Sequence, residues 1–348
     1  MNQSDATASL VAENFPPEAV LFGLTPAMAE IRHSIEKIAG TNIPVLLEGE
    51  SGTGKEVIAN FIHRNSLWSG GPFVKVNCPA IPGTLVESEL FGYERGAFTG
   101  AYGAKPGRVA MADCGTLFLD EISELALNLQ SKLLQLLQDG QFCPIGARQD
   151  KKIEIRVVCA TNRRLDREIA SGRFRQDLFY RISGMVIQLP PLRERVADIP
   201  ILVNYFISVH SKRYQRRVPP LSPATMALLR THEWPGNIRE LENLTKRYVV
   251  LGTEGMITRE LKSRRLEHFE PDVPLDNSVP LKEVTRGAIR DLESKIILST
   301  LEANHWNRKR AAQELKISYR ALLYKLKRSG LDLAREARDV KPELSSAD

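Results

Sequence analysis

Residues 49–55 read Gly-Glu-Ser-Gly-Thr-Gly-Lys, which matches the first seven positions of the phosphate-binding loop pattern. The glycines let backbone N–H groups turn toward phosphate oxygens, and a helix that starts here adds the partial positive charge of its N-terminus. Lys55 is placed to reach the β- and γ-phosphates, and Glu56 stands where Ser or Thr usually offers a hydroxyl to magnesium. The predicted nucleotide-binding residues are Gly49, Glu50, Ser51, Gly52, Thr53, Gly54, Lys55 and Glu56.

Two adjacent carboxylates, Asp120 and Glu121, follow the apolar run 116–119. Neighbouring side chains at a strand end point in different directions, so Asp120 is predicted to hold magnesium, directly or through water, and Glu121 to activate the attacking water. An Asp-Glu pair after a strand is also common as a helix cap. Downstream of a phosphate-binding loop, however, the pair predicts nucleotide hydrolysis.

These two groups need a scaffold that brings them together. From about residue 21 to 190, short apolar runs alternate with amphipathic stretches, which is typical of a parallel sheet with crossover helices. The predicted strands are 45–47, 73–76, 116–119, 155–158 and 185–187. Because a strand, a glycine-rich loop and an amphipathic helix follow one another around residue 50, a chance glycine-rich turn is disfavoured.

The length of 348 residues predicts two or three domains, and 43% hydrophobic with 26% charged residues is ordinary for globular proteins. After residue 190 the pattern becomes helical, and three prolines without periodicity in 270–280 predict a linker. The expected organisation is an arm at 1–20, an α/β ATPase subdomain at 21–190, a helical lid at 191–266, a linker at 267–280, a three-helix DNA-binding domain at 281–331 and a tail at 332–348.

Several classes of protein are excluded. No run approaches the ~18 apolar residues of a membrane span, and the N-terminus lacks the basic start and apolar core of a secretory signal. The four cysteines form no Cys-x-x-Cys pair, which favours reduced thiols in a cytoplasmic protein. The six histidines form no cluster with metal-ligand spacing, so we expect no metal beyond nucleotide-bound Mg²⁺.

The positive charge is concentrated near the C-terminus. The chain has 48 − 42 = +6 overall, and residues 301–340 alone hold ten Lys or Arg and five acids, or +5. Helices at 308–315 and 319–328 with a turn at 316–318 form a helix-turn-helix pattern, in which Ala311 and Ala312 permit a close crossing. A basic hairpin for protein contacts is the alternative. The residues predicted to contact DNA are Arg308, Lys309, Arg310, Ser318, Tyr319, Arg320, Tyr324, Lys325, Lys327 and Arg328.

With the loop GESGTGKE, the Asp-Glu pair and the segment GAFTGA in place, residues 21–266 closely resemble the AAA+ domain of bacterial sigma-54-dependent transcriptional activators. Further matching segments are 87–101 (ESELFGYERGAFTGA), 112–121 (ADCGTLFLDE), 159–165 (CATNRRL), 172–181 (GRFRQDLFYR), 189–195 (LPPLRER) and 234–241 (WPGNIREL). The resemblance implies a P-loop three-layer αβα sandwich with a helical lid, and it makes Glu56 ordinary. The C-terminal segment resembles a Fis-type domain, although a Gly usually stands where this chain has Lys316.

The resemblance also implies a role for residues 96–101. Taken alone, two glycines around small residues and one aromatic describe a mobile surface loop. In the family this loop contacts sigma-54 and moves with the nucleotide state, and a second loop at 144–147 supports it. The implied contact residues are Gly96, Ala97, Phe98, Thr99, Gly100 and Ala101, with Phe98 and Thr99 foremost.

Six more residues map onto family roles. Asn77 resembles the residue that reorients Glu121, although an Asn that simply ends a strand in a turn is a serious alternative. Thr161 and Asn162 resemble the sensor of the γ-phosphate, and Arg239 resembles the sensor of the lid. Arg175 and Arg181 resemble the fingers that reach the neighbouring subunit's nucleotide. Fingers that act in trans imply a ring, expected to be a hexamer.

The resulting expectation is an activator that binds double-stranded enhancer DNA, as a dimer through its C-terminal domain. Its ring would hydrolyse ATP and carry sigma-54 RNA polymerase holoenzyme from the closed to the open promoter complex. The alternatives are an AAA+ motor with another protein client and a DNA-binding repressor with residual ATPase. About 20 residues precede the ATPase, too few for a receiver domain. The signal therefore comes from a separate regulatory protein, or from a domain removed by truncation.

Overall fold

The computed structural model describes residues 15–80, 85–267 and 306–328, with residues 293, 294, 296, 297, 300, 301 and 304. The chain divides into two units, residues 1–261 and 262–348, and each is considered by itself. Most of the predicted arm, the linker after residue 267 and the tail at 332–348 lie outside the described residues.

The first unit contains a five-stranded parallel sheet in the order β2-β5-β8-β1-β9. The strands are β1 (Val45–Glu48), β2 (Phe73–Asn77), β5 (Thr116–Asp120), β8 (Arg156–Thr161) and β9 (Met185–Gln188). This confirms the predicted parallel sheet, although β8 begins one residue later than expected and runs three residues further. In a parallel sheet all strands end at the same edge, so the polar residues that follow β1, β2, β5 and β8 lie along one edge.

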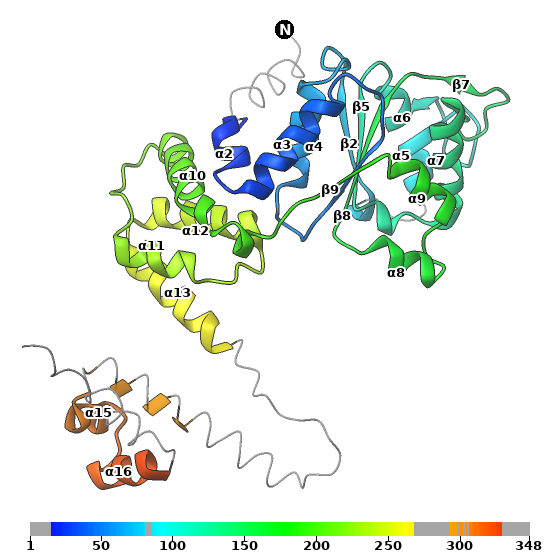
Figure 1. Ribbon diagram of the computed structural model, residues 1–348. Coiled ribbons are helices and arrows are strands. Elements are labelled where there is room, and N and C mark those ends of the chain that lie inside the picture. The colour runs from blue at the N-terminus through cyan, green and yellow to red at the C-terminus, as the bar shows by residue number, and fades with distance from the viewer. Residues whose placement is uncertain are drawn as a thin grey trace, which may run out of the picture. The chain divides into compact units, whose positions relative to one another are not determined.

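Helices cover both faces of the sheet, as the alternation along β5 requires (Figure 1). Leu117 and Leu119 join one apolar cluster, whereas Phe118 joins the other. The first face is covered by α5 (Val86–Phe91), α6 (Arg108–Met111), α7 (Leu127–Asp139) and α9 (Gln176–Ile182), and the second by α2 (Glu18–Phe22), α3 (Pro26–Ile38) and α4 (Lys55–Arg64). The three-layer αβα prediction is therefore confirmed. Helix α2 spans the domain boundary expected at residue 21.

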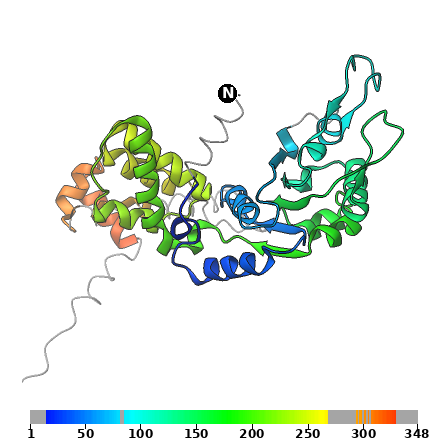
Figure 2. The same cartoon turned by 90° about the horizontal axis from the view of Figure 1, so that it is seen from above.

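Two antiparallel ribbons, which we did not predict, lie outside the sheet. They are β3 (Gly92–Tyr93) with β4 (Lys105–Pro106), and β6 (Gln141–Phe142) with β7 (Lys151–Lys152). The loops that they enclose, in cyan and green, extend away from the sheet (Figure 2). An isolated bridge between Tyr93 and Ile145 joins the bases of these loops. Strands of two residues are too short to show a period-2 pattern.

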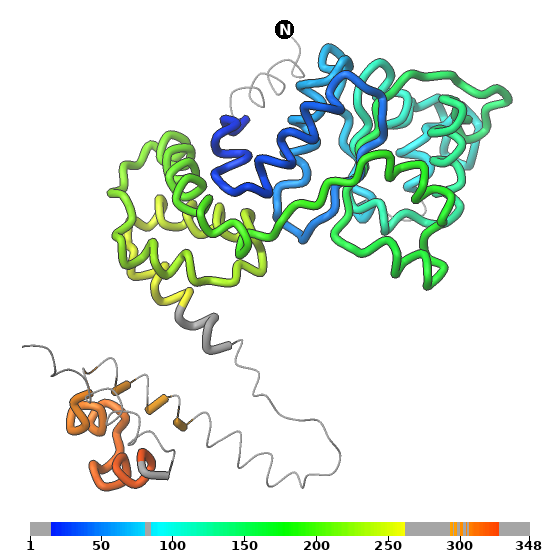
Figure 3. Tube along the Cα trace, in the orientation of Figure 1, coloured from blue at the N-terminus to red at the C-terminus, as the bar shows by residue number. Residues whose placement is uncertain are grey.

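The chain then passes from β9 into a helical lid (Figure 3). The lid consists of α10 (Ile199–Tyr214), α11 (Pro223–Arg230), α12 (Asn237–Leu251) and α13 (Glu254–Glu267), and residues 191–267 contain no strand. Trp234 and Tyr248 are fully buried in its core, and the indole N–H of Trp234 donates to the Leu229 carbonyl. The predicted switch from mixed to helical structure near residue 190 is confirmed.

The second unit contains α15 (Arg308–Glu314) and α16 (Tyr319–Arg328), as the helix-turn-helix pattern predicted. Ala311, Ala312, Leu322 and Leu326 are buried in one apolar cluster. The Asn307 side chain accepts the Arg310 N–H and so caps α15. Lys316 has φ +53°, the left-handed conformation that favours glycine and that leads into the turn.

Candidate functional site

The phosphate-binding loop lies between β1 and α4, and Lys55 is the first residue of that helix. The Lys55 side chain is buried, and its Nζ donates to the carbonyl oxygens of Gly49 at 2.8 Å and Glu50 at 3.2 Å. Burial lowers the pKa of Lys55, while the carboxylates of Glu121 and Asp120 act in the opposite direction. The loop thus holds a cation whose positive charge is supported by the two predicted catalytic carboxylates.

The lid packs directly on this loop. Gly52 has φ +82°, and a Cβ there would lie 2.4 Å from the Gly236 carbonyl oxygen. The backbone N–H groups of Ile238 and Arg239 both donate to the Gly52 carbonyl, at 2.9 and 3.3 Å. Glycine is therefore required at position 52 by two independent constraints, which are backbone conformation and close approach.

Side chains of the lid reinforce this contact. Arg239 donates to the Ser51 hydroxyl at 2.9 Å, so the predicted lid sensor does lie at the loop. Arg193 forms two hydrogen bonds with the Glu50 carboxylate, at 2.7 and 2.9 Å. Asn237 is fully buried, and its amide also donates to Glu50 and to the Ser51 carbonyl. Hydrogen bonds from Arg193 and Asn237 lower the pKa of Glu50.

Sequence reasoning gave no role to Arg193 or Asn237. Arg193 lies in the LPPLRER segment and Asn237 in WPGNIREL, and both segments match the resembling family. Membership of these matching segments was the signal in the sequence that could have identified the two residues. Their contacts with residue 50 span 143 and 187 positions, which no local pattern reveals.

The carboxylate pair lies at the end of β5, where the sequence placed it. Asp120 ends the strand, and Glu121 has φ +55° and ψ +53°, a left-handed conformation that is uncommon for a residue with a Cβ. Its carboxylate accepts the Asn162 N–H at 2.9 Å and lies 3.7 Å from Lys55 Nζ. Such a conformation costs about 1 kcal/mol or more and is concentrated at functional sites.

Residues of β2 lie beside this pair. Asn77 aligns with Asp120 in the strand register, so both predicted side chains lie at the same sheet edge. Lys75, which we did not predict, forms an ion pair with Glu56 at 2.6 Å and lies 3.9 Å from Asp120. Glu56, in the first turn of α4, is therefore paired with Lys75 of β2.

The end of β8 contacts the segment after β5. Thr161 is fully buried, and its hydroxyl lies 3.1 Å from the Ser123 hydroxyl and accepts the Arg163 N–H at 3.0 Å. Asn162 contributes its backbone N–H to Glu121, as described above. The two predicted sensor residues thus join β8 to the catalytic segment, one through a buried side chain and one through the backbone.

The two predicted fingers lie at the two ends of α9, Arg175 as its N-cap and Arg181 in its last turn. The Arg175 guanidinium makes two hydrogen bonds to Asp177, at 2.6 and 3.0 Å, and a third to Ser131. Arg181 donates twice to the Leu137 carbonyl, at 2.6 and 3.0 Å. Both side chains are thus held by groups of their own subunit, at α7 and α9.

These residues fit ATP with magnesium. The loop offers a buried ammonium group and inward backbone N–H groups to phosphates, and Asp120 offers the oxygen ligands that Mg²⁺ prefers. Lys55, Glu121 and Asn162 are joined to one another in the structure. Asp120 would hold the ion, together with water.

The GAFTGA loop is exposed at its tip. Gly96 and Gly100 have φ +80° and +106°, and a Cβ at either would meet no atom within 4 Å. Gly96 N–H donates to the Ala101 carbonyl at 2.9 Å and closes the tip, while Ala97 packs against Gly146 of the second loop. Phe98 is 45% exposed and lies edge-on to Tyr93 at 4.9 Å, and Thr99 is exposed.

The predicted DNA-contacting residues lie on α15, α16 and the turn. Lys309, Arg310, Ser318, Tyr319, Arg320 and Tyr324 are exposed, and Arg308 and Lys325 are partly buried. Ser318 accepts the Ala321 N–H and caps α16, and Lys325 forms an ion pair with Glu293 at 2.6 Å. The side chains of Lys327 and Arg328 lie outside the described atoms. Leu323 of α16 is partly buried.

No helix in the described part of the chain is both long and apolar enough to cross a membrane.

Comparison with known families divides the chain into three parts. Residues 21–188 match the Sigma-54 interaction domain, residues 193–274 the AAA+ ATPase lid domain, and residues 288–328 the Fis family of bacterial regulatory proteins.

The chain is also similar to characterised regulators and to solved structures. Regulatory protein AtoC from Escherichia coli (strain K12) is 45% identical over 316 residues, which are 89% of this chain and 68% of the relative. The Nif-specific regulatory protein of Azotobacter vinelandii is 42% identical over 310 residues, or 89% of this chain and 58% of the relative. The crystal structure of NtrX from Brucella abortus in complex with ATP is 31% identical with a TM-score of 0.67, over 94% of this chain and 72% of that chain. The chain therefore belongs to the family of transcriptional regulators that combine a Sigma-54 interaction domain with an AAA+ lid and a Fis-family DNA-binding domain.

Proposed function

We propose that this chain is an ATP-driven activator of sigma-54 RNA polymerase. The observation that carries the proposal is the joining of Lys55, Glu121 and Asn162 at one sheet edge, in a chain that also has the exposed GAFTGA tip. The structure of NtrX, a similar protein, in complex with ATP supports nucleotide binding by this chain.

The hydrolysis that we propose uses residues of two subunits. The phosphate-binding loop and Lys55 orient the triphosphate, and Glu121 accepts a proton from the attacking water. Bound magnesium, held by Asp120, would neutralise charge on the β- and γ-phosphate oxygens. Arg175 and Arg181 of a neighbouring subunit stabilise the charge that develops on the γ-phosphate, and this requires a ring. No covalent intermediate with the protein is needed.

The link to the polymerase is proposed to run through the loops. Glu121 contacts the end of β8 and Lys55, and the GAFTGA loop leaves the same α/β layer through the β3–β4 ribbon. A change at the nucleotide would be passed to the tip, where Phe98 and Thr99 meet sigma-54. The helix-turn-helix, with exposed Lys309, Arg310 and Arg320, binds double-stranded enhancer DNA and raises the local concentration of the ring.

The test is open-complex formation by sigma-54 polymerase on a promoter with a bound enhancer, in the presence of ATP. Wild type is expected to open the promoter, and Thr99→Ala to fail while its ATPase rate stays within about twofold, because Thr99 is exposed in the GAFTGA loop, outside the phosphate-binding loop and the carboxylate pair. Thr99→Ser, which keeps the hydroxyl, is the matched control. ATP turnover without opening by wild type would instead indicate an AAA+ motor with another client.

A further inference from the structure

Gln130 is a fully buried polar residue in the first turn of α7. Its neighbours at the same depth in this helix, Leu129 and Leu133, are apolar and join the core. A buried amide is stable only when its donors and its acceptor are satisfied, so the groups that it meets are informative.

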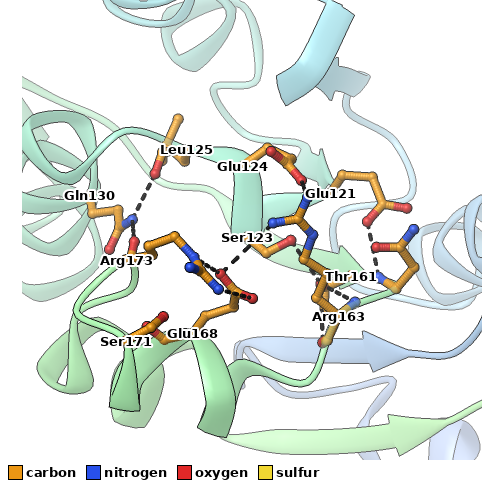
Figure 4. Close-up of polar contacts among 11 residues, drawn as sticks. Glu121, Ser123, Glu124, Leu125, Gln130, Thr161, Arg163, Glu168, Ser171 and Arg173 are labelled. Carbon is orange, nitrogen blue, oxygen red and sulfur yellow. Dashed lines mark hydrogen bonds and ion pairs between the residues drawn. The ribbon is translucent and has the colours of Figure 1, made fainter. Parts of the chain in front are cut away.

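All three of its hydrogen bonds are made to backbone. The Nε2 group donates to the Leu125 carbonyl at 2.7 Å and to the Arg173 carbonyl at 3.0 Å (Figure 4). Oε1 accepts the Arg175 N–H at 2.9 Å. Two carbonyls on one side and an N–H on the other define which end of the amide is nitrogen. Glutamine is the one side chain of this length with two donors and an acceptor at its end.

These backbone groups lie in two segments, one that follows the catalytic carboxylates and one that carries the first finger. Leu125 follows Asp120 and Glu121 after the short 3₁₀ turn η2 (Ile122–Glu124). Arg173 to Arg175 form the loop that begins α9 and carries the first finger. One side chain thus joins the segment after the carboxylates of a subunit to the finger that the same subunit would offer to its neighbour.

An ion-pair network fixes the same loop from the other side. Arg173 makes two hydrogen bonds to the buried Glu168, at 2.7 and 3.1 Å, and Arg163 lies 3.8 Å from Glu168. Arg163 also pairs with Glu124 at 2.5 Å, next to Ser123 (Figure 4). The loop is therefore anchored at its start by Glu168 and across residues 173–175 by Gln130.

We propose that Gln130 is a positioning residue for Arg175, holding the finger loop in register with the segment that follows Glu121. The inference rests on the proposed function, because it requires Arg175 to act on a neighbouring subunit's nucleotide. Removing the amide leaves three backbone groups unpaired, and the loop is then free to move the guanidinium away from its place.

The test uses the full-length chain with Gln130→Met, which keeps the length but removes the polar groups. Gln135→Met, an exposed glutamine on the same helix, is the matched control. We expect kcat for ATP to fall on the order of 10²-fold with KM and ADP binding near wild type, and Gln135→Met to behave as wild type. We expect kcat to fall without a change in KM or in ADP binding because the phosphate-binding loop of the variant is intact.

Mixing experiments separate positioning from damage to the fold. Lys55→Ala has a disabled loop but an intact finger, so equal mixing with Gln130→Met is expected to restore roughly a quarter of wild-type activity, since about a quarter of neighbours pair correctly in a ring. Arg175→Ala mixed with Lys55→Ala is the reference. If the Arg175→Ala mixture recovers activity and the Gln130→Met mixture does not, the inference is overturned. If neither recovers, the trans finger and the inference are both overturned.

Gln130→Glu provides a second variant if Gln130→Met does not fold. A carboxylate at this position faces two carbonyl oxygens, whereas a protonated carboxyl group can donate to one of them. The ratio of its kcat to the wild-type value is therefore expected to rise as pH falls from about 8 to about 6, because burial favours the protonated form. A constant ratio in protein that still binds ADP would contradict the proposal.

Discussion

The phosphate-binding loop and the GAFTGA loop are both rich in glycine, but the structure uses their glycines differently. At Gly52 a Cβ would lie 2.4 Å from a lid carbonyl, and two lid N–H groups bond to the Gly52 carbonyl. At Gly96 and Gly100 a Cβ would meet nothing within 4 Å, and only the positive φ favours glycine. The first loop is packed and the second is open.

This difference in packing matches two different uses of a loop, which are catalysis at the phosphate-binding loop and contact with a partner at the GAFTGA loop. A packed loop gives fixed N–H groups and a fixed Lys55, as a site of electrostatic stabilisation requires. An open tip with a half-exposed Phe98 can change shape at small cost and meet a partner. Glycine alone therefore does not identify a function. What the added Cβ would meet distinguishes the two uses.

The largest effect is expected from Glu121→Gln, which changes the chemistry beside the packed loop and leaves the tip untouched. The variant should bind ATP but hydrolyse it 10²- to 10⁴-fold more slowly (order of magnitude), because the amide cannot accept the proton of water. Single-turnover hydrolysis and fluorescent ATP binding measure the two steps. A normal rate of hydrolysis in this variant would exclude Glu121 as the group that accepts the proton of the attacking water.

A matched pair of glycine substitutions tests the comparison directly. Gly52→Ala adds a collision with the Gly236 carbonyl to left-handed strain, so we expect it to lower stability by about 2–3 kcal/mol and ATP affinity at least tenfold. Gly100→Ala adds strain alone, about 1 kcal/mol. Thermal unfolding and ATP titration of both variants give the values. Equal losses in the two variants would show that packing against the lid contributes nothing.

A smaller effect, of opposite sign, is expected at Lys316. This residue has φ +53° without being glycine, and it is exposed. Lys316→Gly should stabilise the C-terminal unit by about 1 kcal/mol, because the left-handed strain disappears. Since Lys316 was not assigned a DNA contact, specific DNA affinity should change little. Denaturant unfolding followed at Trp306 measures the change, and a loss of stability would contradict the strain argument.

The smallest effect concerns pH at the packed loop. Bonds from Arg193 and Asn237 lower the pKa of Glu50 from its ordinary value of 4.5. Its stabilising contribution is therefore complete above that value and is lost as pH falls through the lower, folded-state pKa. The difference in Tm between wild type and Glu50→Gln should be small at neutral pH and should shrink as pH falls below 4.5 and through the lower, folded-state pKa. A difference that grows in acid would have the wrong sign.

Local patterns in the sequence predicted the five strands of the parallel sheet, the phosphate-binding loop and the position of Asp120 and Glu121. Each is encoded within a few residues, as an apolar run or a fixed spacing. Arg193, Asn237, Lys75 and Gln130 were not identified, because each has a partner that lies between 19 and 187 positions away. The left-handed Glu121 was missed for a different reason, since its conformation depends on the contacts at Asn162 and Lys55.

The strand order has a consequence for how the protein folds during synthesis. Strand β1, which leads into the phosphate-binding loop, pairs with β8 and β9, and those strands end at residues 161 and 188. A ribosome that adds 5–20 residues per second needs about 7–28 s to reach residue 188 after it has completed residue 48. Until residue 161 has been added β1 has neither neighbour, and until residue 188 has been added it has only β8 beside it, so its three buried residues are incompletely covered. The sheet therefore stays incomplete, with apolar surface and strand edges that favour aggregation, until its last strand emerges.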